Sequence, residues 1–221
     1  ATEMYSAGID RLTHQPLSFS VSETTEGVHI HIIDAELMGK GEKEKKDLYI
    51  EGVQNNGIIN HYEYIINSEG TIEIRHVLKP EGKMPLWFPR IGLTLTVSDA
   101  LDQVKWYGRG PQENYPDRKT GYPMGIYAST VQAMYEPYLM PQDYGLRTDV
   151  RWLQLTTDKG IGLQFKMNEW FNFNIYPYST DNLTKAMYTY QLQKQKGMTL
   201  NLDYATTGVG CTARGVFGAY K

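Results

Sequence analysis

The sequence contains a single cysteine, Cys211, among its 221 residues. No intrachain disulfide can form, and a chain of this length buries a core large enough to fold without one. The thiol lies in a glycine-rich segment and has no base near it in the sequence, so we do not predict a nucleophilic cysteine. Because disulfides are neither needed nor available, both the cytoplasm and the periplasm stay open as compartments.

A long apolar run and an excess of basic charge are also missing. No segment approaches the roughly 20 apolar residues that span a bilayer, and the first residues lack the basic and apolar regions of a signal peptide. The 22 basic and 25 acidic residues form no basic stripe of the kind that binds polyanions. We therefore expect a soluble chain that partners neither a membrane nor a nucleic acid, with any export signal outside this sequence.

Tyrosine and glycine are abundant, with 17 and 21 copies, which is typical of β proteins. Apolar residues alternate with a period of two, which predicts half-buried strands; the segments are 72–78, 91–97, 161–167, 171–175 and 200–204. The turn sequence Asn-Ser-Glu-Gly at 67–70 predicts a hairpin between 61–66 and 71–78. With no repeat or linker in the chain, we expect one all-β domain over residues 1–221, an antiparallel β-sandwich.

Two segments interrupt this pattern. A short helix is predicted over 182–187, because Ser179 can cap its N-terminus. The charged run at 42–47 is predicted to be a solvated loop tip between two strands.

All five histidines lie in the first 76 residues, and His29 and His31 share one face of a predicted strand. That spacing offers two nitrogens to a metal ion. No cysteine or acidic residue lies at ligand spacing nearby, so ordinary histidines on a sheet surface are the favoured interpretation. We predict no metal site.

One loop contains the residues most suggestive of chemistry, in the sequence WYGRGPQENYPDR at 106–118. Its prolines exclude a helix and indicate an ordered loop. Glu113 and Asp117 form an acid pair, and a glycosidase needs two carboxylates about 5 to 9 Å apart. Arg118 can pair with either acid, in which case the group locks the loop to the ends of the sheet. The structural interpretation is favoured, and the chemical one stays open at this point.

The same motif closely resembles the signature of the C-terminal (small-chain, fifth-domain) region of the large bacterial β-galactosidases of glycoside hydrolase family 2. Further segments match that region in chain order. They are 89–93, 134–138 with Pro141 and 145–147, then 172–175, 178–179, 200–203 and 207–210.

This resemblance implies a super-sandwich of large antiparallel sheets, similar to galactose mutarotase. It also implies that the chain is a fragment, whose parent carries its catalytic glutamates in an upstream (β/α)8 barrel, so no residue here is predicted to be catalytic. The module is expected to shape substrate access and to support assembly. Glu113, Asn114, Tyr115, Asp117 and Arg118 are then a structural loop, with a sugar contact as the alternative.

The resemblance further implies partners and cofactors of the parent enzyme. These are a β-galactoside such as lactose, the upstream domains, other copies in a homo-oligomer, and magnesium with a monovalent cation; none of the cofactors is expected in this domain. The family tryptophan that lines the galactose site would fall near Gly215 and is absent. We expect Thr212, Arg214 and Gly215 to supply the substrate contacts there.

Two other functions remain as alternatives. A stand-alone carbohydrate-binding module would expose aromatic rings on one face. A mutarotase-like epimerase would bring a histidine base and an acid together across a concave sheet.

Overall fold

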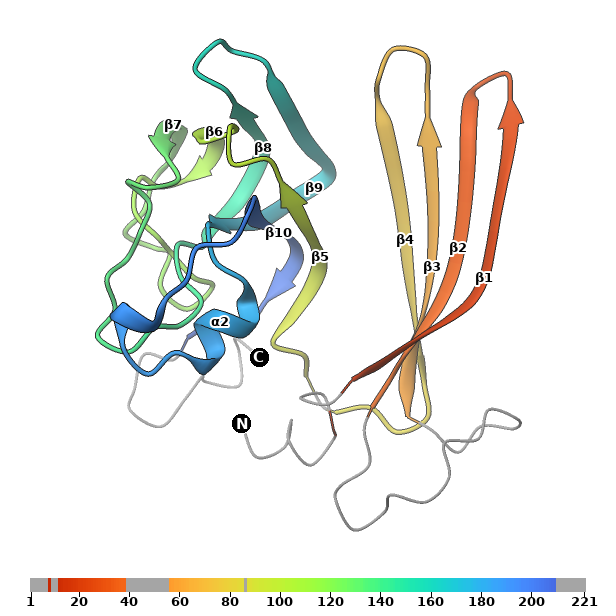
Figure 1. Ribbon diagram of the computed structural model, residues 1–221, viewed down its shortest axis with the longest axis horizontal. Coiled ribbons are helices and arrows are strands. Elements are labelled where there is room, and N and C mark those ends of the chain that lie inside the picture. The colour runs from red at the N-terminus through yellow and green to blue at the C-terminus, as the bar shows by residue number, and fades with distance from the viewer. Residues whose placement is uncertain (1–7, 9–11, 39–55, 86, 210–221) are drawn as a thin grey trace. The chain divides into compact units, whose positions relative to one another are not determined.

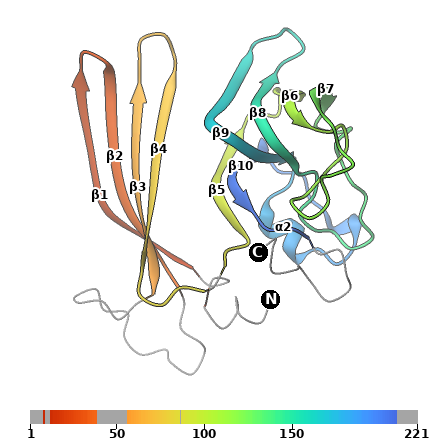
Figure 2. The ribbon, with the colours of Figure 1, turned by 180° about the vertical axis from the view of Figure 1, so that it is seen from behind.

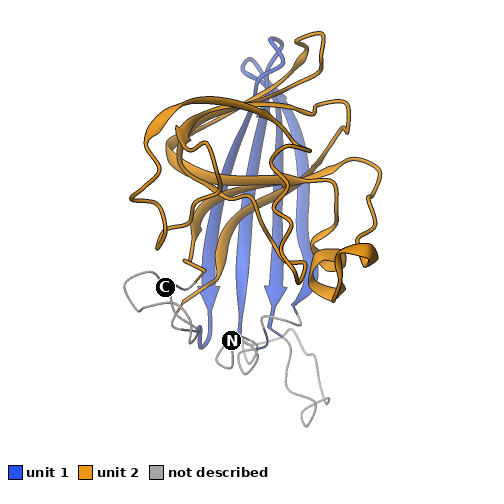
Figure 3. Cartoon of the chain, turned by 90° about the vertical axis from the view of Figure 1, so that its left-hand side faces the viewer, with its two compact units in different colours: residues 1–86 blue, residues 87–221 orange. Residues whose placement is uncertain are grey.

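A computed structural model of the chain describes residue 8 and residues 12–38, 56–85 and 87–209. The chain divides into two compact units, residues 1–86 and 87–221, which Figure 3 colours separately. Both contain antiparallel sheets, the components that the predicted super-sandwich requires, and the all-β fold class is confirmed. The single domain over 1–221 stays a prediction, and the charged run at 42–47 lies outside the described residues.

Unit 1 is a four-stranded sheet with the order β1-β2-β3-β4 (Figures 1 and 2). Its strands are β1 (Thr13–Thr24), β2 (Gly27–Leu37), β3 (Gly57–Ile66) and β4 (Ile72–Glu81). The predicted hairpin is confirmed between β3 and β4. Asn67 Oδ1 accepts the backbone N–H groups of Glu69 and Thr71, both at 3.0 Å, and Gly70 takes a positive φ of 81° that suits glycine.

Unit 2 contains a six-stranded antiparallel sheet with the order β5-β10-β9-β8-β6-β7 (Figure 1). Its elements are β5 (Arg90–Val97), β6 (Gln103–Arg109), β7 (Met124–Thr130), β8 (Arg147–Thr156), β9 (Gly162–Tyr176), α2 (Thr180–Lys185), η3 (Thr189–Gln191) and β10 (Met198–Thr206). The predicted helix is confirmed as α2, two residues earlier than expected. Ser179 caps it, since its hydroxyl accepts the Asn182 N–H at 3.0 Å.

The main core of unit 2 lies on one face of this sheet. Apolar side chains of β6, β8, β9 and β10 pack there, with Trp106, Leu153 and Phe173 at its centre and each at most 1% exposed. Full burial of such a side chain contributes about 2 to 3 kcal/mol. A smaller cluster of Tyr144, Tyr176 and Leu183 attaches α2 to the same unit.

No helix among the described residues combines the length and hydropathy required to cross a bilayer.

Candidate functional site

Residues 171–176 of β9 and 198–203 of β10 are buried on both faces of the strand, and the face opposite the apolar core forms a polar layer in unit 2. In β9, Phe171 and Phe173 enter the core while Asn172 and Asn174, between and after them, are 8% and 0% exposed. In β10, Asn201 and Asp203 are each 1% exposed. A buried polar group without a partner costs about 1 to 3 kcal/mol, so this layer is stable only if its groups are paired.

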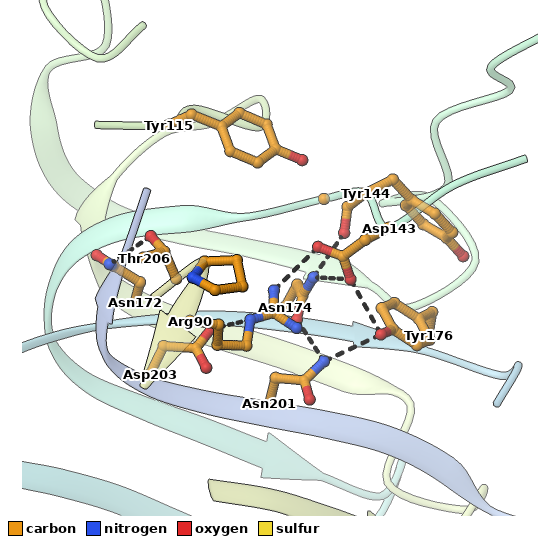
Figure 4. A network of polar contacts seen from close by, with 12 residues as sticks. Arg90, Tyr115, Asp143, Tyr144, Asn172, Asn174, Tyr176, Asn201, Asp203 and Thr206 are labelled. Carbon is orange, nitrogen blue, oxygen red and sulfur yellow. Dashed lines mark hydrogen bonds and ion pairs between the residues drawn. The ribbon is translucent and has the colours of Figure 1, made fainter. Parts of the chain in front are cut away.

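Arg90, at the start of β5, lies between two carboxylates of this layer (Figure 4). Its Nη2 donates to Asp143 Oδ2 at 2.9 Å, and its Nε lies 3.1 Å from Asp203 Oδ2. Asp203 pairs with Gly92 across the sheet, and a Cβ atom at position 92 would come within 2.6 Å of Asp203 Oδ1. Glycine at 92 therefore leaves the space that the carboxylate occupies.

The two acids bound to Arg90 differ in environment. Burial raises the pKa of Asp203 to about 7, although Arg90 opposes the rise; the Asp143 carboxylate adds to it. Neither oxygen of Asp203 has a hydrogen-bond partner among the described residues, whereas Asp143 accepts several donors. Asp203 therefore takes up a proton near neutral pH.

A ladder of side-chain amides continues the network across the neighbouring strands β9 and β10 (Figure 4). Asn201 donates to Asn174 Oδ1 at 2.8 Å and to the Tyr176 hydroxyl at 3.0 Å. Asn174 in turn donates to Asp143 Oδ1 at 2.8 Å. The antiparallel register, which pairs Asn201 with Asn174, places these side chains side by side. Asp143 thus links the segment between β7 and β8 to β9 and, through Asn174, to β10.

Glu113 forms a second hub, in the loop between β6 and β7, and its side chain is 7% exposed. Its Oε1 accepts Arg118 Nη2 at 2.6 Å and also the Tyr138 hydroxyl. Its Oε2 accepts the Gly145 N–H at 2.8 Å and the Tyr115 hydroxyl at 3.3 Å. Burial and the bond to Glu113 raise the pKa of Tyr138 to about 12, so this phenol stays a donor at neutral pH.

Asn114 fixes the same loop to β8 and is fully buried. Its backbone N–H donates to Leu146 O at 2.8 Å. Its side-chain oxygen accepts the backbone N–H and the hydroxyl of Thr148, at 3.1 and 2.5 Å. Glu113 thus attaches the loop to the segment before β8, and Asn114 attaches it to the start of β8.

Asp117 and Arg118 of the same loop are less buried. Arg118 lies over the Tyr115 ring, 5.3 Å from its centroid, and its side chain is 47% exposed. Asp117 Oδ1 accepts the Val209 N–H at 3.2 Å, which attaches the loop to the segment after β10. The structure thus brings Glu113, Tyr115 and Arg118 together and places Asp117 at a different contact.

Thr212, Arg214 and Gly215, the expected substrate contacts, lie outside the described residues, as does Cys211.

Removing the Arg118 side chain should have a modest effect. We expect Arg118→Ala to lower the free energy of unfolding by about 1 kcal/mol, because the guanidinium is half exposed and Glu113 keeps three other donors. Urea unfolding followed by tryptophan fluorescence measures this change. A loss above about 3 kcal/mol, typical of a broken buried ion pair, would contradict the half-exposed geometry.

Two carboxylates in and near the loop, those of Glu113 and Asp149, are held by several donors. Glu113 accepts four donors, and Asp149 is held by Arg109 Nε at 2.5 Å and Lys119 Nζ at 2.8 Å. Despite its burial, Asp149 has a lowered pKa because of these two cations. A glycosidase needs one acid that donates a proton and one free carboxylate, and the loop acids do not have that arrangement.

Sequence reasoning missed the polar layer. Arg90, Asp143 and Tyr176 gave no local signal, since their partners are distant in the chain. Alternation along β9 and β10 contained a signal, because Asn172, Asn174, Asn201 and Asp203 fall between core residues. Asparagine is depleted in strands. Its recurrence at every second position, on strands that pair with each other, could have indicated a buried amide ladder.

Comparisons with known proteins point to one family. The chain is 38% identical over 147 residues to the β-galactosidase of Priestia megaterium, a match covering 66% of the chain and 14% of that protein. It is 39% identical over 122 residues to the enzyme of Vibrio cholerae, with 55% and 11% covered. A β-galactosidase of Aeromonas hydrophila matches at 28% over 208 residues, which is 92% of the chain and 18% of that enzyme.

The matches therefore span less than a fifth of each of these relatives' length. Residues 5–218 also match the profile of the family described as the beta galactosidase small chain. The match covers nearly the whole sequence and includes both the Glu113 loop and the polar layer. The chain belongs to the β-galactosidase small-chain family.

Proposed function

We propose that this chain is the C-terminal module of a retaining β-galactosidase that removes terminal β-D-galactose residues. The catalytic glutamates lie in an upstream barrel domain of the same enzyme. The module shapes substrate access and supports the assembly of a homo-oligomer. The observation that carries this proposal is the saturation of Glu113 by four donors, which makes the signature loop a fixed surface rather than a source of reactive acid.

The substrate contacts follow from the same proposal. A β-galactoside such as lactose meets Thr212, Arg214 and Gly215, which follow the segment that Asp117 attaches to the loop. The magnesium and the monovalent cation bind elsewhere in the parent enzyme. Carboxylates of the polar layer do not fit magnesium, which prefers several free oxygen ligands, because Arg90 lies against both Asp143 and Asp203.

A reconstitution experiment tests this role. We expect the purified chain alone to hydrolyse no nitrophenyl β-galactoside, and the parent enzyme truncated before the module to be inactive or nearly so. Mixing the two should restore turnover, because the module completes the substrate site and the assembly. Turnover by the chain alone that disappears in Glu113→Gln, or a mixture no more active than the truncated enzyme, would contradict the proposal.

One observation favours a second candidate, a carbohydrate-binding module. The rings of Tyr188 and Tyr190 lie parallel, with 5.5 Å between centroids, and the two residues are 56% and 79% exposed. Flat exposed rings are suited to stacking on sugars. Calorimetric binding of galactose to the isolated chain, lost in Tyr190→Ala, together with failed reconstitution would favour this function. The epimerase has less support, since the polar layer of unit 2 contains no histidine to act as a base.

A further inference from the structure

Unit 1 gathers three potential metal ligands on one face of its sheet. His29 and His31 project from the same face of β2, as the alternation along a strand requires. The register pairs His31 with Glu63 of β3, so a carboxylate from the neighbouring strand lies beside the two imidazoles. This acid is 32 positions along the chain from His31, which is why no ligand spacing was visible in the sequence.

The ligand atoms of these residues converge. Glu63 Oε1 lies 3.8 Å from His29 Nδ1 and 3.9 Å from His31 Nε2. One ligand atom from each residue lies within 4.8 Å of the other two. Ligand atoms in a tetrahedral zinc site are about 3.4 Å apart, so small side-chain rotations would close the set around an ion.

The surroundings orient two of the ligands. Arg75 Nη1 lies 3.1 Å from Glu63 Oε2, which leaves Oε1 directed at the histidines. His29 has a 14% exposed side chain, and its buried Nε2 has no hydrogen-bond partner among the described residues. The nearest acid to that nitrogen is the Glu26 carboxylate at 3.9 Å. A carboxylate behind a ligating imidazole is the usual second contact of a metal-bound histidine.

We propose that His29, His31 and Glu63 bind one divalent transition-metal ion of the zinc type. Two imidazoles and one carboxylate suit zinc, cobalt or nickel rather than magnesium, which prefers oxygen ligands. Three protein ligands leave coordination positions for water, and the 48% exposed side chain of His31 keeps the site open to solvent. The bound ion links β2 to β3 and so stabilises the sheet of unit 1.

A titration with zinc or cobalt tests the site in the full chain, freed of metal with a chelator. The Cys211→Ser background removes the one thiol, which could bind zinc independently. We expect one ion per chain by calorimetry, and visible cobalt absorption typical of four or five ligands. We expect His31→Gln and Glu63→Gln each to weaken binding at least tenfold. A matched control is His61→Gln, on the same strand and face as Glu63, which should leave binding unchanged.

Further measurements distinguish metal binding at His29, His31 and Glu63 from binding elsewhere in the chain and from no binding. Because His31 is half exposed, its variant should fold, and an unchanged circular dichroism spectrum verifies this. Saturating zinc should also raise the melting temperature of the parent chain and not that of His31→Gln. Equal binding by the parent chain and His31→Gln would place the ion elsewhere, and no binding by the parent chain would leave only contacts between the two histidines and Glu63. Either result overturns the proposal.

Discussion

Replacing Glu113 by alanine should lower the free energy of unfolding by about 3 to 5 kcal/mol. The change removes the acceptor of Arg118, Tyr138, Tyr115 and the Gly145 N–H at once. The Gly145 amide and the Tyr115 hydroxyl then lose a partner in a buried setting, since Tyr115 is 5% exposed. Urea unfolding of the purified chain measures the loss, with tryptophan fluorescence as the signal for unit 2, which contains all four tryptophans.

Two comparison variants make this result specific. Glu113→Gln keeps the shape and one acceptor oxygen, so it should cost less than alanine. Glu169→Ala removes an exposed carboxylate of the same unit and should change stability by no more than about 0.5 kcal/mol. An effect of Glu113→Ala as small as that of Glu169→Ala would show that the hydrogen bonds of the loop do not contribute to stability.

Asp203 should make unit 2 less stable as the pH rises. Its pKa is raised from 3.8 to about 7 in the folded state, chiefly by burial, so the folded state binds more protons than the unfolded state between these values. Stability therefore falls with rising pH through that window, and the expected loss between pH 5 and pH 8 is about 2 to 3 kcal/mol.

The Asp203→Asn variant isolates this contribution, because asparagine does not titrate. The charged groups facing Asp203 are Arg90 and Asp143, and they remain in the variant. Unfolding at several pH values should show a smaller loss between pH 5 and pH 8 for Asp203→Asn than for the parent chain. Asp158→Asn, at an exposed position, is the control and should keep the parent slope. Parallel profiles for the parent and Asp203→Asn would rule out a buried titrating acid at 203.

Local features of the fold could be predicted because their causes are local. The turn at 67–70 needs only a side-chain acceptor at Asn67 and glycine at a positive φ, and both are visible in the sequence. Alternation identified Phe171 and Phe173 as core positions. Prolines around the Glu113 loop correctly indicated ordered structure without a helix.

The contacts that make the site depend on distant parts of the chain. Arg90 and Asp143 are 53 positions apart, and Asn174 and Asn201 are 27 apart. A two-residue period assigns the residues between core positions to the opposite face, but it does not say whether that face meets water or other protein. Arg118 as a partner of Glu113 was foreseeable from a spacing of five residues, whereas Tyr138 and Gly145 were not. The set of His29, His31 and Glu63 depended in the same way on the pairing of β2 with β3.

The burial of both faces of β9 over residues 171–176 has a consequence for how such sequences diverge during evolution. At 171, 173 and 175 the side chains fill volume, so exchanges among apolar residues of similar size are tolerated. At 172, 174 and 176 the side chains must supply particular donors and acceptors, and few exchanges satisfy all of them. Adjacent positions of one strand are therefore selected by two different criteria, size and hydrogen-bonding capacity. An alternating pattern of variable and invariant residues along this strand would identify the module in relatives too distant to be recognised by overall identity.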